Sequence, residues 1–161
     1  MAFDAFIMFD GIEGESTDDK HPGWIEVLSC GMDIQQTIST TASSAGGATA
    51  ERADFGDFHF TKHLDKATPK LALASASGKH FDNIKVELCR AGTEKIKFME
   101  YNFSNSIISS ICMHNNGEFP TETVTLHYAK VQWSYTQQKR SGGMPAGNTV
   151  AGWDCQKNCE V

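Results

Sequence analysis

The chain has 161 residues, of which 40% are apolar and 21% are charged, and its 14 basic and 20 acidic residues give a formal net charge of −6. This length and composition are typical of one soluble globular domain with a buried core, and they argue against wholesale disorder. A net negative surface repels phosphate groups, so nucleic acids and anionic membrane surfaces are disfavoured as partners.

The N-terminal segment does not have the pattern of a signal peptide. Asp4 and Asp10 interrupt the apolar stretch of MAFDAFIMFDGIEGES, and no Lys or Arg precedes it. No later segment reaches the roughly 18 apolar residues that a membrane-spanning helix requires. We therefore expect synthesis and folding in the cytoplasm, no membrane insertion, and, for any exported copy, a route that reads no cleaved leader.

Short runs of β-branched and aromatic residues, separated by turn residues, predict strands at residues 2–9 and 24–36. In the second run apolar side chains occupy both faces, which predicts burial on two sides for part of its length. The stretch that follows, residues 37–53 (TISTTASSAGGATAERA), offers no large side chain to a core. It is also longer than the usual connection in a compact domain. We predict a long flexible loop that extends from the body and contacts another subunit.

One helix is predicted, at residues 70–77. Thr68 fits the N-cap, Pro69 fits the first helical position, and Gly78 suits the C-terminal stop. The sequence KLALASAS between them contains strong helix formers. A helix this short is marginal alone, so we expect it to dock against a sheet.

The remaining runs predict strands, two of which change the face that carries their apolar side chains. The runs are residues 55–61, 83–90, 95–104, 107–113, 123–136 and 149–157. The change falls between Phe98 and Met99 in one run and between Tyr128 and Val131 in another. It requires a β-bulge or a strand that passes between two packing surfaces. We predict an all-β barrel or sandwich of about eight strands with one short α-helix.

The five cysteines lack the spacing of a disulfide framework. Cys30, Cys89 and Cys112 lie in apolar runs and are interpreted as buried thiols. Cys155 and Cys159 near the C-terminus could ligate a metal or crosslink neighbouring subunits. Without a CxxC pair or a companion site, we predict no metal site there.

No pattern of polar residues indicates catalysis or cofactor binding. His59 and His63 fall in a strand, where their side chains would lie about 13 Å apart, and no Glu follows His59 as HExxH requires. His114 and His127 flank a turn and could form a cross-strand pair. Acidic residues within 13–19 lack the spacing of a calcium loop and are interpreted as a hydrogen-bonded turn. Without a GxSxG or phosphate-binding glycine motif, we predict neither an enzyme nor a cofactor.

Several segments are notable for their order along the chain. They are GESTDDKH with WIEVLS (14–21 and 24–29), FTKHLDKATPKL (60–71), SGKHF (77–81), RAG (90–92), TETVTLHYAKVQWSY (121–135) and GWD (152–154). In sequence and order they resemble the Hcp family, the haemolysin-coregulated proteins of bacterial type VI secretion systems. The match spans nearly the whole chain, which argues against coincidence.

The resemblance implies a single β-barrel-like domain over residues 1–161 whose copies form six-membered rings. The rings stack into a hollow tube that a contractile sheath fires from the cell, with effectors in its lumen or on the spike at its tip. The implied partners are other copies of the chain, effectors, the spike protein and the sheath. Family members are recovered outside the cell without a signal peptide, and their role is structural.

Two sets of residues are assigned to this assembly. The loop at 37–53 is expected to reach a neighbouring ring or subunit through Thr40, Thr41, Ser43, Ser44, Gly46 and Gly47. A lumen-side turn is assigned to His114, Asn115 and Asn116, where other members carry a Gly/Ser-rich turn. Two alternatives stay open: a monomeric β-sandwich that binds a carbohydrate or a peptide, and a hydrolase with an unrecognised site.

Overall fold

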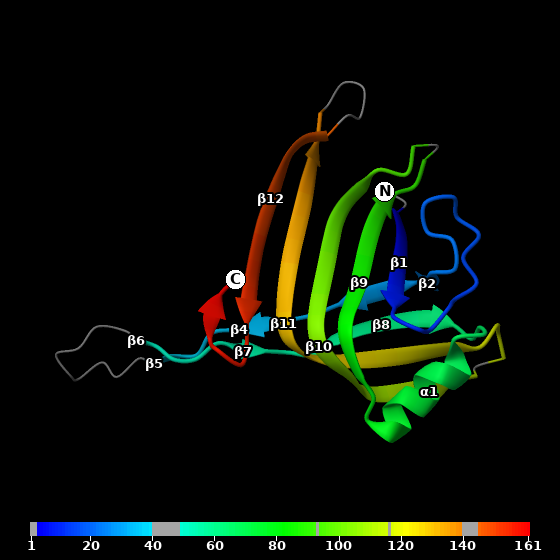
Figure 1. The fold of residues 1–161 in the computed structure, drawn as a ribbon, viewed down its shortest axis with the longest axis horizontal. Helices are drawn as coiled ribbons and strands as arrows, with labels where there is room; N and C mark the ends of the chain where they lie inside the picture. The colour runs from blue at the N-terminus through cyan, green and yellow to red at the C-terminus, as the bar shows by residue number, and fades with distance from the viewer. Residues whose placement is uncertain (1–2, 40–48, 93, 116, 140–144) are drawn as a thin grey trace.

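The computed structural model describes residues 3–39, 49–92, 94–115, 117–139 and 145–161. A nine-stranded antiparallel sheet dominates it, with the strand order β13-β12-β11-β10-β9-β1-β2 and with β8 joining β11 to β3 (Figure 1). Its strands are β1 (Phe3–Phe9), β2 (Ile25–Val27), β3 (Ser29–Gly31), β8 (Phe58–His63), β9 (His80–Arg90), β10 (Lys97–His114), β11 (Thr121–Gln138), β12 (Pro145–Asp154) and β13 (Cys159–Glu160). The predicted all-β fold with one helix is confirmed.

Two strands of 18 residues each, β10 and β11, bend the sheet around its core. The first part of β11 pairs with β8, and its second part pairs with β12. This change of partner explains the predicted change of face along β11, since Tyr128 and Val131 are both buried. The predicted bulge near Phe98 is also confirmed, because the register of β10 on β9 shifts between Lys97 and Met99. Within the described residues the hydrogen-bonded path of strands is not closed.

The predicted strand at 24–36 is wrong in extent and in burial. It is divided among β2, β3 and β4 (Ile34–Gln35), because β2 pairs with β1 whereas β3 pairs with β8. Ile25 and Val27 are buried, while Leu28 on the other face is 49% exposed. Cys30 and Met32 farther along pack partly against the core, so the predicted burial on both faces fails at Leu28.

The helix α1 (Thr68–Ser77) packs on β10 and buries Leu71 and Ala74. Gly78 ends it in the left-handed conformation with a φ of 63°, as predicted. The N-cap prediction was wrong by one residue: Ala67 is the N-cap and makes no side-chain hydrogen bond. Thr68 is therefore the first helical residue and Pro69 the second, and the Thr68 hydroxyl contacts Lys62 Nζ and donates to Glu122 instead of capping the helix.

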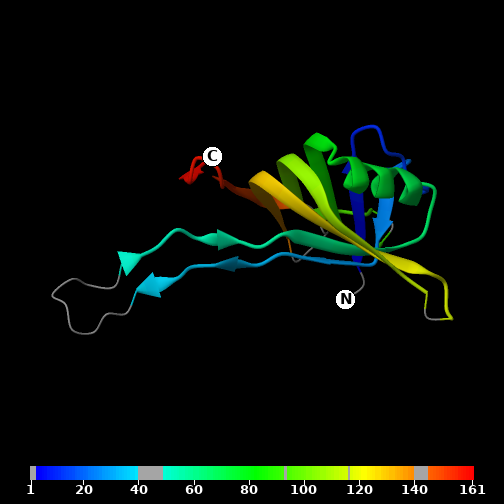
Figure 2. The same ribbon diagram turned by 90° about the horizontal axis from the view of Figure 1, so that it is seen from below.

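An arm leaves the body between β3 and β8 (Figure 2). It consists of two short antiparallel pairs, β4 with β7 (Asp54–Phe55) and β5 (Ile38–Ser39) with β6 (Thr49–Ala50). The stretch predicted as a loop, residues 37–53, therefore has paired strands at both of its described ends. The remainder of that stretch, residues 40–48, lies outside the described residues.

Candidate functional site

The arm exposes two large apolar side chains close together on a thin two-stranded ribbon. Ile34 is 49% exposed and Ile38 is 56% exposed. An isolated two-stranded ribbon is marginally stable in water, and it gains stability when another surface covers it. The exposed isoleucines make the arm a candidate contact surface.

The base of the arm is held firmly against the body. The Tyr128 hydroxyl donates a hydrogen bond to the Gly56 carbonyl at 2.9 Å, and the Gly56 amide donates to the Asp33 carbonyl at 2.9 Å. A side chain at Gly56 would overlap the Asp33 carboxylate. The Phe55 ring stacks on Trp133 and Trp153, with ring centroids 6.5 and 6.3 Å apart. These contacts fix the direction in which the arm leaves.

A second candidate contact surface is the edge formed by β12. β13 pairs with β12 only at Trp153 and Asp154, so the rest of that edge has no strand partner among the described residues. Val150 on β12 and Tyr135 on β11 are 51% and 47% exposed. Open strand edges with exposed apolar residues are templates for pairing with another chain.

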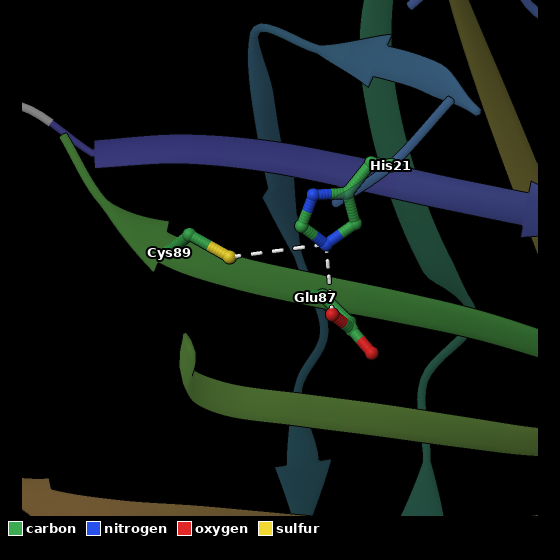
Figure 3. A group of neighbouring side chains, drawn as sticks. All are labelled: His21, Glu87 and Cys89. Atoms are coloured by element: carbon green, nitrogen blue, oxygen red, sulfur yellow. Dashed lines mark hydrogen bonds and ion pairs between the residues drawn. The ribbon is translucent and has the colours of Figure 1, made fainter. Parts of the chain in front are cut away.

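A buried polar cluster lies between the 16–24 turn and the outer face of β1 and β9 (Figure 3). The His21 ring places Nδ1 2.8 Å from Asp18 Oδ1 and Nε2 2.8 Å from Glu87 Oε2. The Cys89 Sγ atom lies 4.0 Å from the same Nε2. The Phe6 ring stacks on the imidazole at 4.2 Å, and His21 is 2% exposed.

Ionic contacts surround this cluster. Lys95 contacts both Asp18 and Asp4, and Lys97 lies 3.2 Å from Glu87 Oε1. The hydrogen bond from Lys95 lowers the pKa of Asp18 to about 2. Asp18 Oδ1 also accepts the backbone amides of Lys20 and His21, each at 3.1 Å, which confirms the predicted hydrogen-bonded turn. Burial raises the pKa of the Cys89 thiol to about 11.

A second buried network joins β8, β11 and α1. Lys62 Nζ lies 2.7 Å from Glu122 Oε1 and 2.8 Å from Asp65 Oδ1. The Thr68 hydroxyl donates to the same Glu122 oxygen at 2.9 Å. Lys62 and Glu122 are both 0% exposed, so this pair is a structural element of the interior.

A serine, an aspartate and a histidine meet at the surface, but in an order that does not activate the serine. The Ser109 hydroxyl donates to Asp57 Oδ2 at 2.8 Å, and His127 Nδ1 lies 2.9 Å from Asp57 Oδ1. The carboxylate therefore separates the hydroxyl from the imidazole, whereas a nucleophilic serine needs the imidazole beside it. The arrangement is a surface hydrogen-bond network.

The predicted histidine pair is wrong. His114 pairs across the ladder with Thr121, and His127 pairs with Ile107, so register keeps the two histidines apart. His59 and His63 are exposed on β8.

Among the predicted buried thiols, Cys89 is buried, Cys30 is partly buried, and Cys112 is exposed. The prediction for Cys112 was wrong because this residue lies near the C-terminal end of β10, where the strand is exposed. All five thiols are free, including those of Cys155 and Cys159.

The residues assigned to assembly are only partly described. His114 ends β10 and is exposed, and Asn115 beside it is exposed too. Asn116 lies outside the described residues, as do Thr40, Thr41, Ser43, Ser44, Gly46 and Gly47. Among the described residues, no helix has the length and apolar character that crossing a membrane requires.

Comparison with known proteins places the chain among type VI secretion proteins. The family described as "Type VI secretion system effector, Hcp" matches residues 6–135. Protein hcp1 of Pseudomonas aeruginosa is 34% identical over 164 residues, which cover 100% of both chains. A solved structure described as a type six secretion system protein has a TM-score of 0.92 and 31% identity over 99% of this chain and 100% of its own. Hcp1 from Salmonella typhimurium has a TM-score of 0.79 and 30% identity, with 99% and 100% covered.

Proposed function

The chain belongs to the Hcp family of type VI secretion system proteins, which are secreted structural proteins, and on this basis we propose that it is a subunit of the exported tube. In this proposal the chain is a single domain whose copies form hexameric rings. The rings stack into a hollow tube that carries or chaperones effectors. The further partners are the spike protein and the sheath. The subunit is cytoplasmic before assembly and extracellular after export.

The arm is the observation that carries this proposal. It projects from the body, its base is fixed by Tyr128 and Gly56, and it presents Ile34 and Ile38 to solvent. A monomeric module would bind its carbohydrate or peptide in a groove of the body and does not require a projecting ribbon. A subunit that must reach a neighbouring copy does, because burial of Ile38 against that copy would contribute roughly 25 cal/mol for each Å² of apolar surface removed from water.

The two candidate surfaces also suit a closed ring. The arm and the open edge of β12 are different parts of the chain, so a contact between them is head-to-tail. Head-to-tail contacts between identical copies generate a ring when the rotation closes. Stacking then requires a separate contact between rings. We assign that contact to the part of the arm at 40–48.

Substitution of Ile38 tests the role of the arm. Ile38→Asp should reduce or abolish the rings seen by negative-stain electron microscopy and shift the mass measured by light scattering toward the monomer. Ile38→Val keeps an apolar side chain at the same position and should assemble as the parent does. Intact rings from Ile38→Asp, or a parent chain that is monomeric at high concentration and at every salt concentration tried, would count against the proposal.

Deletion of residues 41–50 tests stacking, and because it also removes β6, the strand partner of Ile38, negative-stain images of single rings are needed to separate loss of stacking from loss of the ring contact. We expect the circular dichroism spectrum to be retained and long tubes to be lost. Tubes of unchanged length would show that this segment does not join the rings.

The turn at His114, Asn115 and Asn116 is proposed to face the lumen. Introduction of acidic side chains there, as in Asn115→Asp/Asn116→Asp, should alter which effectors are exported with the protein and should leave ring formation unchanged. Loss of the rings would instead place the turn in a subunit contact.

A further inference from the structure

The His21 cluster contains three side chains of the kinds that bind transition metals, and they converge from two separate segments (Figure 3). His21 comes from the turn that covers the sheet, and Glu87 and Cys89 alternate on one face of β9. One donor atom from each lies within 4.8 Å of the other two. We propose that His21, Glu87 and Cys89 form a binding site for a divalent transition-metal ion, with zinc as the ion that fits the donors best. The site lies in the monomer and does not depend on the proposed assembly.

The distances between the donors suit a small tetrahedral ion. Zinc bonds to nitrogen, oxygen and sulfur are about 2.0–2.3 Å long, so adjacent ligand atoms in a tetrahedron lie roughly 3.3–3.8 Å apart. The observed separations lie on either side of this range: 2.8 Å from His21 Nε2 to Glu87 Oε2 and 4.0 Å from Nε2 to Cys89 Sγ. The third separation, between the donor atoms of Glu87 and Cys89, is at most 4.8 Å, so side-chain movements of up to about 1 Å would bring all three pairs into range.

The chemistry of the donors selects the class of metal. Imidazole nitrogen and thiolate sulfur are ligands for zinc and its first-row neighbours, whereas calcium and magnesium require oxygen ligands. A carboxylate completes a mixed set that zinc accepts. We therefore expect zinc and cobalt to bind and magnesium and calcium not to.

The His21 and Glu87 side chains are held by neighbouring residues through the atoms that would face away from the metal, Nδ1 and Oε1. Asp18 Oδ1 lies 2.8 Å from His21 Nδ1 and can hold a proton on that nitrogen. Nε2 hydrogen-bonds Glu87 Oε2 at 2.8 Å in this structure, so a metal ion that enters between them would displace the proton of that hydrogen bond. Lys97 contacts Glu87 through Oε1, so the other carboxylate oxygen, Oε2, faces the imidazole. Phe6 stacks on the ring within 5° of parallel and fixes its plane. Asp18, Lys97 and Phe6 are positioning residues in this proposal.

The site has room for a fourth ligand. A cavity of about 500 Å³ opens beside the three donors and is also lined by Lys20, Glu94, Ile96 and Lys97. A water molecule or a side chain could enter from it. Three protein ligands and one position open to a cavity are the arrangement of zinc sites that keep an exchangeable ligand.

Cobalt spectroscopy on the full chain distinguishes this site from the other thiols. The reduced, metal-free protein should bind one equivalent of Co²⁺ and develop the visible bands of a tetrahedral ion together with a thiolate-to-cobalt charge-transfer band. Cys89→Ser should lose the charge-transfer band. Cys112→Ser and the double variant Cys155→Ser/Cys159→Ser are matched controls and should retain it.

Competition with a chromophoric chelator measures zinc affinity in the same proteins. Asp18→Asn should weaken zinc binding roughly 10–100-fold, as loss of an outer-shell partner does. Glu87→Gln and Cys89→Ser should weaken it by more. Near-ultraviolet circular dichroism checks that each variant is folded.

Three results would overturn the proposal: a parent spectrum without a thiolate band, a band that persists in Cys89→Ser, or a band that is lost in Cys155→Ser/Cys159→Ser. A nuclear magnetic resonance measurement covers the case in which the Cys89 variant does not fold. In the parent protein, zinc should shift the His21 Nε2 resonance and preserve the proton on Nδ1. Zinc that leaves the His21 ring unchanged would mean that the cluster is only a buried ion-pair network.

Discussion

The buried network around Lys62 and Glu122 predicts that removing Lys62 costs more unfolding free energy than removing Glu122, although the two residues form one ion pair. Lys62 Nζ has acceptors besides Glu122, namely Asp65 Oδ1 and the His63 carbonyl, each at 2.8 Å. Among the described residues, the Thr68 hydroxyl is the one donor to the Glu122 carboxylate besides Lys62. No hydrogen bond from the described residues reaches its second oxygen, Oε2.

These contacts set the expected magnitudes. Breaking a buried ion pair by removing one partner costs about 3–5 kcal/mol of unfolding free energy, because the other charge stays buried. Glu122→Gln leaves the ammonium of Lys62 with Asp65, so we expect a loss of about 3 kcal/mol. Lys62→Met leaves the carboxylate with a single hydroxyl donor, so we expect a loss of about 5 kcal/mol.

Guanidinium chloride unfolding, followed by tryptophan fluorescence at a protein concentration that keeps the chain monomeric, measures both losses. The double variant Lys62→Met/Glu122→Leu is the control, since it removes both charges and should be less destabilised than Lys62→Met alone. The reasoning is refuted if Lys62→Met is no more destabilising than Glu122→Gln, or if the double variant loses the sum of the two single losses.

Further predictions concern the arm base, the helix and the turn. Tyr128→Phe should lose about 1 kcal/mol of unfolding free energy near pH 7, because the hydrogen bond to Gly56 is removed. Burial raises the pKa of the folded Tyr128 phenol, while the unfolded phenol ionises near pH 10. Above about pH 10 the unfolded phenol ionises while the folded one does not, so the parent should lose stability relative to Tyr128→Phe. Urea unfolding of both proteins at about pH 7 and at a pH above about 10 would test this. Leu71→Ala should cost about 2–5 kcal/mol in thermal or urea unfolding, whereas Leu73→Ala, at a position that is 67% exposed, should stay within about 0.5 kcal/mol. Gly14→Ala should destabilise more than Leu73→Ala in the same assay, because its new side chain would overlap the Trp24 carbonyl.

Local patterns predicted most of the fold because strands and turns have short-range causes. The face change at Phe98 predicted a β-bulge or a strand that passes between two packing surfaces, and the register shifts there as a bulge requires. The glycine after the helix ends it as expected. The errors at Leu28 and Cys112 share another cause, since alternation tells which residues share a face and does not tell whether another layer covers that face. That depends on which strands pair, and pairing is a long-range property.

The difference between short-range pattern and long-range contact also applies to the two buried networks, the one around Lys62 and Glu122 and the one around His21. Lys62 shares its face of β8 with Phe58 and Phe60, and Glu122 shares its face of β11 with Val124. The strands predicted at 55–61 and 123–136 each stopped one residue short of these charges, so the buried pair was missed; with each strand extended by one residue, the alternation would have placed both charges at inward positions. The cluster around His21 gave no such signal, because it depends on a turn folding over residues that follow it by 66 positions in the chain.

The segments that resemble the family lie mainly where the interior is held together. FTKHLDKATPKL supplies Lys62 and Thr68, TETVTLHYAKVQWSY supplies Glu122, and GESTDDKH supplies Asp18 and His21. The arm supplies none of these interactions, although it is the surface proposed to contact other copies. The resemblance therefore specifies the fold of one subunit more directly than it specifies ring size or stacking. Stability measurements on the interior and imaging of the arm variants accordingly test independent claims, and a variant that unfolds says nothing about assembly.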